Sequence, residues 1–388
     1  MNYEFSERDQ KYLEEFREIA RRETTPALLE ETRRWGGIYG APEGRKLIQK
    51  IGARGLLTPN WPKEYGGQGT NEFVAYAIRD ELAYAGLPWS FVAAAMAGPT
   101  ILRFGTDELK NEWLPPIARG QYEFALGYTE PQAGSDLSAL MIKAEDKGDH
   151  FLVNGQKIYN THTHLADYHW LAARTDPDAP RHKGVSFFIV DLKSPGITIR
   201  PMVTMAGWQT NVVYYDDVTV PKKNMVGEKN RGFYYLMAAL DFERMFPPGA
   251  YRKHLENIVQ YAKETVVDGK PLSKNPLVRQ KLAQMATEVE VARLLYYQLP
   301  HILDKGQIPN YQSSMEKLFA TELAQRISNT GMEITGLYGP LAQGSKWAPL
   351  AGTPAHYYQW SVVETIYAGT SEIQRNIMAT RGLEMPRA

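Results

Sequence analysis

The sequence predicts an α+β protein with three successive regions: helices, a small β-domain, and a second set of helices. Apolar residues recur every three or four positions near both ends of the chain, as helices with one buried face require. Between them lie short segments rich in β-branched and aromatic residues, which is typical of half-buried strands. Because helices and strands are segregated along the chain, we expect separate layers rather than a doubly wound fold. The expected boundaries are 1–120, 121–230 and 231–388.

The first region is predicted to be helical throughout. Ser6 is placed to cap a helix whose apolar positions include Leu13, Phe16, Ile19 and Ala20. Pro42 and Thr70 are expected to start two more helices, and Thr106 to cap a fourth. The apolar stretch 87–102 is predicted to be a buried core helix.

Strands are predicted over residues 151–158, 184–191 and 211–220, with Asn154-Gly155 as a turn signal inside the first segment. The helical period returns afterwards, and long helices are expected over 276–304 and 312–337. No strand followed by a GxGxxG fingerprint opens the chain, which argues against a Rossmann NAD site.

Composition excludes several classes of protein. The 388 residues include 44 Lys plus Arg and 44 Asp plus Glu, so no basic excess favours nucleic acid or anionic lipid. The chain has no cysteine, which excludes disulfides, thiolate metal sites and a cysteine nucleophile. Residues 1–16 lack the apolar core of a secretory signal, and 87–102 is too short and too interrupted to span a bilayer. We therefore expect a soluble, cytoplasmic protein.

Two short segments point to chemistry. Residues 128–136 read YTEPQAGSD, and residues 366–375 read IYAGTSEIQR. Hydroxyls and exposed backbone N–H groups on a glycine-bearing loop suit a flat polar cofactor or a phosphate. Either segment alone is more often a surface turn.

Together the two segments resemble the flavin-contacting signatures of acyl-CoA dehydrogenases. The segments 155–175, 218–233 and 379–387 are similar to further parts of that family, in the same order and spacing. The resemblance implies an N-terminal α-domain, a middle β-barrel and a C-terminal four-helix bundle, with FAD between barrel and bundle. It also implies dehydrogenation of an acyl-CoA, an electron-transferring flavoprotein as partner, and a homotetramer.

The resemblance assigns cofactor contacts to eleven positions: Leu126, Tyr128, Thr129, Gly134, Ser135, Tyr159, Asn160, Thr161, Gly336, Thr370 and Glu372. Several neighbouring residues depart from the family pattern. Leu126 stands where many members have Tyr, and Thr265 and Asp268 replace the Arg and Phe that touch a neighbouring subunit's flavin. Pro276 and Glu333 each replace a family Gln. We expect FAD to be bound differently here, with help from Arg279, or more weakly.

The catalytic base of the family is commonly a Glu at the position of Ala368, which cannot accept a proton. One branch, similar to isovaleryl-CoA dehydrogenase, carries the base instead on a pocket-lining helix within Leu-Asp-x-Glu-Arg. Residues 240–244 read LDFER, so the resemblance assigns Glu243 as base. A base for an α-proton is a carboxylate whose pKa is raised by burial. The resemblance assigns substrate contacts to Ser135, Asp241, Arg244, Ala368 and Gly369.

His162, His164 and His169 raise the question of a metal site. No carboxylate or thiolate nearby completes a tetrahedral set, so we expect no metal.

Two alternatives to a self-sufficient dehydrogenase remain open. The first is an acyl-CoA oxidase or flavin monooxygenase on the same scaffold, with reduced flavin open to oxygen. The second is one subunit of a heteromeric acyl-CoA dehydrogenase, which the missing Arg and Phe would explain. The acyl group is expected to be cyclic, branched or dicarboxylic, by analogy within the family.

Overall fold

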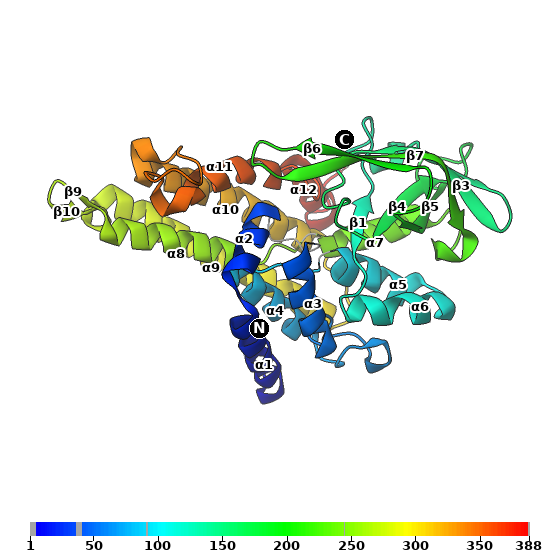
Figure 1. The fold of residues 1–388 in the computed structure, drawn as a ribbon, viewed down its shortest axis with the longest axis horizontal. Coiled ribbons are helices and arrows are strands. Elements are labelled where there is room, and N and C mark those ends of the chain that lie inside the picture. The colour runs from blue at the N-terminus through cyan, green and yellow to red at the C-terminus, as the bar shows by residue number, and fades with distance from the viewer. Residues whose placement is uncertain (1–4, 36–40, 91, 244, 387–388) are drawn as a thin grey trace. The chain divides into compact units, whose positions relative to one another are not determined.

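The computed structural model describes residues 5–35, 41–90, 92–243 and 245–386, without the side chains of residues 33–35, 238 and 241–243. The chain forms two compact units. We call the described residues within 5–75 and 87–243 the sheet unit, and those within 76–86 and 245–386 the helical unit. Figure 1 shows the helices and strands of both units.

Among the described residues, six α-helices precede the sheet: α1 (Glu7–Glu23), α2 (Pro26–Trp35), α3 (Pro42–Ala53), α4 (Glu72–Ala85), α5 (Gly98–Phe104) and α6 (Asp107–Ala118). The predicted caps are confirmed for α1, where Ser6 Oγ accepts from the Asp9 N–H at 3.2 Å, and for α6, where Thr106 accepts from Leu109 at 3.3 Å. The start of α3 at Pro42 is also confirmed. The start predicted at Thr70 is two residues early, because the side chain of Asn71 accepts the Val74 N–H and caps α4.

The apolar stretch 87–102 contains buried residues throughout, but it is helical only from residue 92 onward. Ala93–Ala97 form a π-helix that leads directly into α5. A Cβ on Gly98 would lie 2.1 Å from the Trp61 ring, so the close approach of this helix to Trp61 requires glycine. The prediction of a buried helix is confirmed for residues 93–102, whereas residues 87–90 precede it without helical structure.

The β-domain is one eight-stranded sheet, ordered β6-β7-β3-β2-β4-β5-β8, with β1 paired in parallel with β4. The strands are β1 (Phe124–Gly127), β2 (Lys143–Asp146), β3 (His150–Lys157), β4 (Tyr168–Arg174), β5 (Val185–Asp191), β6 (Ile197–Val203), β7 (Gln209–Pro221) and β8 (Met225–Val226). The turn predicted at Asn154-Gly155 is wrong. β3 continues through this dipeptide, and the register against β7 shifts there, so Gly155 at φ 140° forms an irregularity rather than a turn.

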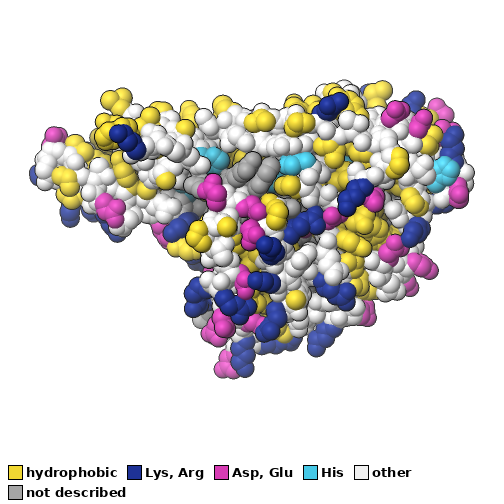
Figure 2. All heavy atoms as spheres, in the orientation of Figure 1, with side chains coloured by type: hydrophobic (Ala, Val, Ile, Leu, Met, Phe, Trp, Pro, Cys, Tyr) yellow, Lys and Arg dark blue, Asp and Glu magenta, His cyan; other side chains and the backbone are white. Residues whose placement is uncertain are grey.

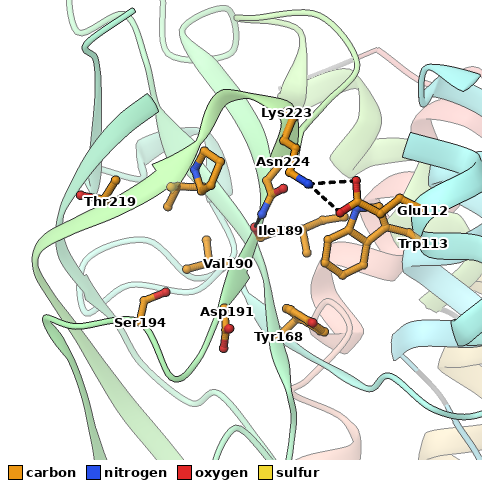
Figure 3. Close-up of a pocket in the computed structure, with 12 residues that line it drawn as sticks. Glu112, Trp113, Tyr168, Ile189, Val190, Asp191, Ser194, Thr219, Lys223 and Asn224 are labelled. Carbon is orange, nitrogen blue, oxygen red and sulfur yellow. Dashed lines mark hydrogen bonds and ion pairs between the residues drawn. The ribbon is translucent and has the colours of Figure 1, made fainter. Parts of the chain in front are cut away.

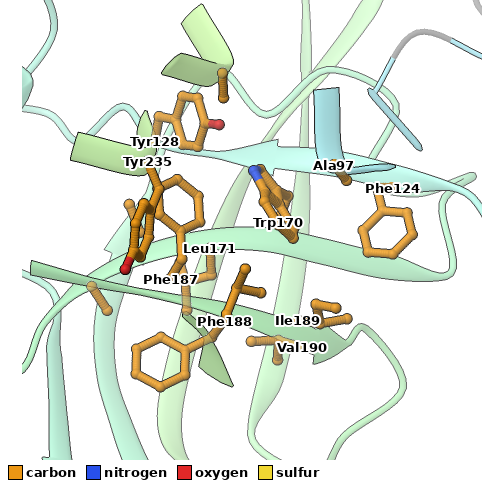
Figure 4. Close-up of a cluster of buried hydrophobic side chains, with 14 of the residues drawn as sticks. Ala97, Phe124, Tyr128, Trp170, Leu171, Phe187, Phe188, Ile189, Val190 and Tyr235 are labelled. Atoms are coloured by element: carbon orange, nitrogen blue, oxygen red, sulfur yellow. The ribbon is translucent and has the colours of Figure 1, made fainter. Parts of the chain in front are cut away.

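The core of the sheet unit is aromatic. Trp170 packs against Phe187 with ring centroids 5.1 Å apart, and Tyr128 meets Phe187 edge to face at 5.6 Å (Figure 4). Edge-to-face contacts satisfy the ring quadrupoles in addition to burying area. This core anchors the loop that follows β1.

Helix α7 (Gly232–Glu243) packs on the same core through Tyr235, Leu236 and Ala239. Its first residue is glycine because a Cβ there would lie 2.7 Å from the Ser186 backbone of β5. The close contact between α7 and β5 sets the position of the helix that carries the LDFER motif.

The helical unit is built from α8 (Gly249–Glu264), α9 (Pro276–Leu303), α10 (Tyr311–Thr335), α11 (Thr353–Glu364) and α12 (Ser371–Ile377). Its core lies between α8, α9 and α10, around Leu255, Ile258, Val289 and Leu323. The predicted helices 276–304 and 312–337 correspond to α9 and α10 and are confirmed. A hairpin of β9 (Val266–Val267) and β10 (Lys270–Pro271) joins α8 to α9.

Charged side chains of both signs are interspersed over the N-terminal helices on the face drawn in Figure 2. Several of them form ion pairs, including Lys46 with Glu43 and Arg54 with Glu15. Within the residues that the structure describes, no helix combines the length and apolar character needed to cross a membrane.

Candidate functional site

The first signature segment forms a loop that is held by one buried carboxylate. Glu130 accepts hydrogen bonds from the backbone N–H groups of Met141 and Ile142, at 2.6 and 3.0 Å, and from the Lys157 ammonium at 2.9 Å. The Glu130 backbone also exchanges two hydrogen bonds with Ala133. The Glu130 side chain therefore connects the start of the loop, beside Thr129, to its end at residues 141–142. The loop between them carries Gly134 and Ser135.

The Glu130–Lys157 pair is buried on both sides, with 3% and 0% of the side chains exposed. Burial lowers the pKa of Lys157 to about 8, against the attraction of Glu130. Burial works to raise the pKa of Glu130, but Lys157 and the two backbone donors outweigh it and hold it below its ordinary value. Both groups are charged at neutral pH. Lys157 was missed in the sequence analysis, although a lysine on the inward face of a strand is itself a signal.

The loop and the segment 157–161 form one wall. Ile158 N–H donates to Thr129 O at 2.9 Å, and Asn160 Nδ2 donates to Leu126 O at 2.8 Å. Thr161 Oγ1 lies 3.3 Å from Thr210 Oγ1. The structure thus brings the expected contacts Leu126, Thr129 and Thr161 together, although they are as much as 35 residues apart in sequence.

The remaining predicted residues of this wall differ in exposure. Tyr159 is 61% exposed at φ 59°, and Gly134 and Ser135 are exposed, so all three are accessible to a ligand. The Asn160 and Tyr128 side chains are buried. Since the Tyr128 ring packs in the core, its expected contribution to a cofactor site is restricted to its backbone.

Two buried polar groups beside this wall have no hydrogen-bond partner among the described residues: Asn160 Oδ1 and both ring nitrogens of His162. Burial, followed by the neighbouring His164, lowers the pKa of His162 to about 3, so its ring is neutral. Over the part of the chain that is described, no group of three or more His, Asp or Glu side chains is placed to hold a metal ion. Unsatisfied polar atoms next to exposed hydroxyls fit a polar ligand on this wall.

The second signature segment, 366–375, lies in the helical unit. It includes most of the turn between α11 and α12 and the start of α12. It borders a pocket of about 460 Å³ that is lined by residues of α10, the turn and α12, including Gln325, Thr365, Thr370, Glu372 and Arg375. Two expected cofactor contacts, Thr370 and Glu372, therefore line a cavity. Thr370 also caps α12 by accepting from the Ile373 N–H at 3.3 Å.

The positions that depart from the family pattern have local structural reasons. Asp268 and Gly269 form the two-residue turn of the β9–β10 hairpin, at φ 50° and 74°, and such a turn favours Asp-Gly. Glu333 pairs with Lys281 of α9. Gly336 ends α10 at φ 59° and is exposed, so it is accessible to a ligand.

The LDFER motif ends α7, whose last residue is Glu243. The side chains of Asp241 and Glu243, and all of Arg244, lie outside the described residues. Their predicted roles therefore stay predictions.

Two buried carboxyl groups of the helical unit escaped the sequence analysis. Glu316 accepts from the Phe246 N–H and is 1% exposed. Glu364 accepts from Trp360 Nε1 at 2.7 Å, and its other oxygen has no partner among the described residues. Burial raises the pKa of Glu364 to about 8 and that of Glu316 well above its ordinary value. The Glu364 carboxyl is therefore mostly protonated at pH 7.

A second pocket, of about 350 Å³, lies in the sheet unit (Figure 3). Trp113 and Tyr168 line it, with ring centroids 4.8 Å apart, and the Glu112–Lys223 ion pair at 2.9 Å lies beside them. None of the predicted site residues lines this pocket.

Comparison with known proteins identifies the family. Three family models match: the acyl-CoA dehydrogenase N-terminal domain at residues 6–121, the middle domain at 125–218 and the C-terminal domain at 230–383. Acyl-CoA dehydrogenase FadE26 of Mycobacterium tuberculosis is 37% identical over 375 residues, which covers 94% of each chain. The chain therefore belongs to the acyl-CoA dehydrogenase family of oxidoreductases and has its fold.

Two solved structures are also similar over the full length of both chains. One is the Tcur3481-Tcur3483 steroid ACAD, at 34% identity and a TM-score of 0.90. The other is the ChsE4-ChsE5 complex from Mycobacterium tuberculosis, at 35% identity and a TM-score of 0.90. Members of this family depend on FAD. The exposed hydroxyls and unsatisfied buried polar atoms of the sheet unit, and the pocket beside Thr370, fit such a group.

Proposed function

We propose that the protein is an FAD-dependent acyl-CoA dehydrogenase that introduces a double bond between Cα and Cβ of an acyl-CoA thioester, with Glu243 as base. The observation that carries the proposal is a pair of replacements. Ala368 occupies the position of the common base, and a carboxylate occurs instead at the end of α7, in LDFER. The alanine alone would leave the site without a proton acceptor, and the carboxylate in LDFER would supply one from another position.

Each unit, taken by itself, offers groups that fit the cofactor. Thr129, Ser135 and Thr161 of the sheet unit offer hydroxyls, and Thr370 and Glu372 line the pocket of the helical unit. When bound, FAD would supply the acceptor for the hydride from Cβ. The Glu130–Lys157 pair orients the loop that carries Thr129 and Ser135.

The protein's own residues would handle the proton. Glu243 takes the Cα proton, and the electron pair of that C–H bond moves toward the thioester carbonyl. Backbone N–H groups around Ala368 and Gly369 would bind that carbonyl oxygen, where negative charge develops. Asp241, Arg244 and Ser135 would bind other parts of the acyl-CoA.

We propose a bulky cyclic acyl group as substrate. The support is the similarity to a protein described as a steroid ACAD, together with a base on α7 rather than at position 368. We also propose that the electrons pass to an electron-transferring flavoprotein and that the protein acts in the cytoplasm.

An acyl-CoA panel with an artificial electron acceptor tests the activity, and extraction with spectral identification tests the cofactor. We expect FAD, and turnover that is highest on cyclic or branched acyl-CoAs. Recovery of FMN or a nicotinamide would contradict the cofactor proposal. Highest turnover on long straight chains would contradict the substrate proposal, and steady oxygen consumption would favour the oxidase alternative.

A second proposal concerns the oligomeric state. The family resemblance implies a homotetramer, whereas the β9–β10 hairpin favours a heteromer. Val266 and Val267 of the hairpin are 60% and 48% exposed, and the family's Arg and Phe are absent around them. The similar ChsE4-ChsE5 structure is a complex of two components. Light scattering and flavin content should be measured for the chain alone and after co-expression with a second chain of the family. Full flavin and activity in a homotetramer would refute the heteromer, and an active monomer would refute both.

A further inference from the structure

The turn between α11 and α12 has an unusual backbone. Ala368 and Gly369 both adopt left-handed conformations, at φ 53° and 85°. Glycine accepts this conformation readily, whereas alanine resists it by roughly 1–2 kcal/mol. A residue in such a conformation persists only where its surroundings hold it.

Gln374 supplies that restraint. Its side chain is completely buried, and its Nε2 donates to the carbonyl oxygens of Ala368 at 2.9 Å and Gly369 at 3.1 Å. A Cβ on residue 369 would lie 2.5 Å from this nitrogen, so the second position must be glycine. The Gln374 backbone N–H donates to Thr370 O at 2.9 Å, which fixes the glutamine in the first turn of α12.

The other end of the turn is fixed as well. Buried Lys317 donates to Glu364 O at 2.9 Å, and Ser371 N–H donates to Thr365 O at 3.0 Å. The Tyr367 N–H donates to Val363 O at 3.0 Å. The turn is therefore a rigid unit in which Gln374 holds the two central carbonyls.

The N–H groups of Ala368 and Gly369 are available to a ligand. Within the described ranges, neither the Ala368 N–H nor the Gly369 N–H donates to a protein acceptor. Both residues are half-buried, so neither is freely solvated. Successive N–H groups in such turn conformations form an anion-binding concavity.

We propose that Gln374 is a positioning residue for catalysis. The Ala368 carbonyl and the Gly369 N–H belong to the same planar peptide group, so by holding that carbonyl Gln374 directs the Gly369 N–H toward the carbonyl oxygen of the acyl-CoA thioester. This donor stabilises the negative charge that reaches this oxygen when the Cα–H electron pair moves into the enolate and Glu243 takes the proton. The inference rests on the function proposed above. It differs from a purely structural role for Gln374, which would affect only folding.

Acetoacetyl-CoA separates the two roles. Its Cα proton is acidic without a base, and the enolate gives a long-wavelength band beside oxidised flavin. The pH midpoint of that band therefore measures stabilisation of the enolate oxygen, independently of Glu243 and of the natural acyl group. We would titrate the flavin-loaded protein, Gln374→Met, and Thr321→Val as control. Thr321 is buried in α10 and donates to Lys317 O of its own helix, so its replacement removes a buried hydrogen bond of the same unit without touching the Ala368 and Gly369 carbonyls.

We expect Gln374→Met to raise the midpoint by about one pH unit or more, a tenfold loss of enolate stabilisation, and Thr321→Val to leave it unchanged. With the best acyl-CoA of the panel, kcat should fall by roughly 10–100-fold at a nearly constant KM, the pattern of an interaction made in the transition state. Gln374→Leu, which removes both polar groups of the amide, serves if Gln374→Met does not fold. An unchanged midpoint in the variant would overturn the inference. Absence of the band in the unmodified protein would instead contradict the proposed function.

Discussion

At the scale of single residues, the site depends on groups that are buried and paired in unusual ways. The Lys157 ammonium is completely buried, yet it donates to Glu130 and to Tyr128 O, so its charge is compensated. Leaving one member of a buried ion pair without its partner is strongly destabilising, because the remaining charge is desolvated and unpaired. This ion pair therefore helps to order the loop that carries Thr129 and Ser135.

Replacing Glu130 by Gln should therefore loosen the loop and release flavin. We expect a loss of about 3–5 kcal/mol in the free energy of unfolding, because Lys157 is left buried without a counter-charge. The double variant Glu130→Gln/Lys157→Met should recover part of this loss. Urea unfolding and flavin content per chain measure both effects. Strictly additive losses from the two single replacements would show that the residues are not coupled.

Glu243 is the second residue on which the proposed function depends. Glu243→Gln keeps size and packing but removes the proton acceptor, so flavin content and acyl-CoA binding should survive. Flavin reduction should fall by roughly 10²–10⁴-fold or more. Adding Ala368→Glu tests whether the other base position can act, although Glu at φ 53° carries a backbone cost. Stopped-flow reduction of Glu243→Gln at the unmodified rate would remove Glu243 from the mechanism.

At the scale of elements, close contacts between backbone segments determine where the functional helices and loops lie. α7 can contact β5 only because its first residue, Gly232, has no side chain. The hairpin β9–β10 is closed by Asp268-Gly269, a two-residue turn that excludes a large aromatic residue from that position. In both cases the local backbone restricts which residues are possible.

Gly232→Ala should displace α7 from β5 and move the end of the helix that carries Glu243. We expect a loss of about 1–3 kcal/mol in the free energy of unfolding, typical of overpacking. kcat should fall more than flavin content, because the displaced groups include the proposed base. Denaturant titration and steady-state kinetics of the variant measure the two effects. Unchanged stability would mean that α7 and β5 can separate at no cost.

At the scale of the whole molecule, buried ionisable groups make stability depend on pH. Glu364 has its pKa raised by burial to about 8, so between its ordinary value of 4.5 and pH 8 it is protonated in the folded state and ionised in the unfolded state. The unfolded state therefore binds fewer protons in this window, and stability falls as pH rises. Burial lowers the pKa of His162 to about 3, which has the opposite effect. The contribution of this neutral side chain to the stability of the protein is lost as pH falls below about 6.5.

Glu364→Gln should flatten the pH dependence of unfolding between about pH 5 and 8. One fully shifted group contributes up to about 1.4 kcal/mol for each pH unit, and a neutral amide removes this term. The urea midpoint, measured at half-unit steps of pH, gives the slope. Thr321→Val, which carries no titratable group, should shift the midpoint equally at every pH. A slope unchanged by Glu364→Gln would mean that Glu364 is ionised in the folded protein.

The sequence by itself determined the family, the order of helices and strands and the starts of several helices, and it predicts the candidate base. Periodicity, caps and signature segments are local properties, so neighbouring residues suffice to express them. It failed at Asn154-Gly155, where pairing of β3 with β7 turned a local turn signal into an irregularity within a strand. Only the tertiary structure decided that Glu130 pairs with Lys157, that Glu364 is neutral, and that Gln374 holds the turn at Ala368. Burial and partners that are distant in sequence set these properties, and both arise only when separate segments pack together.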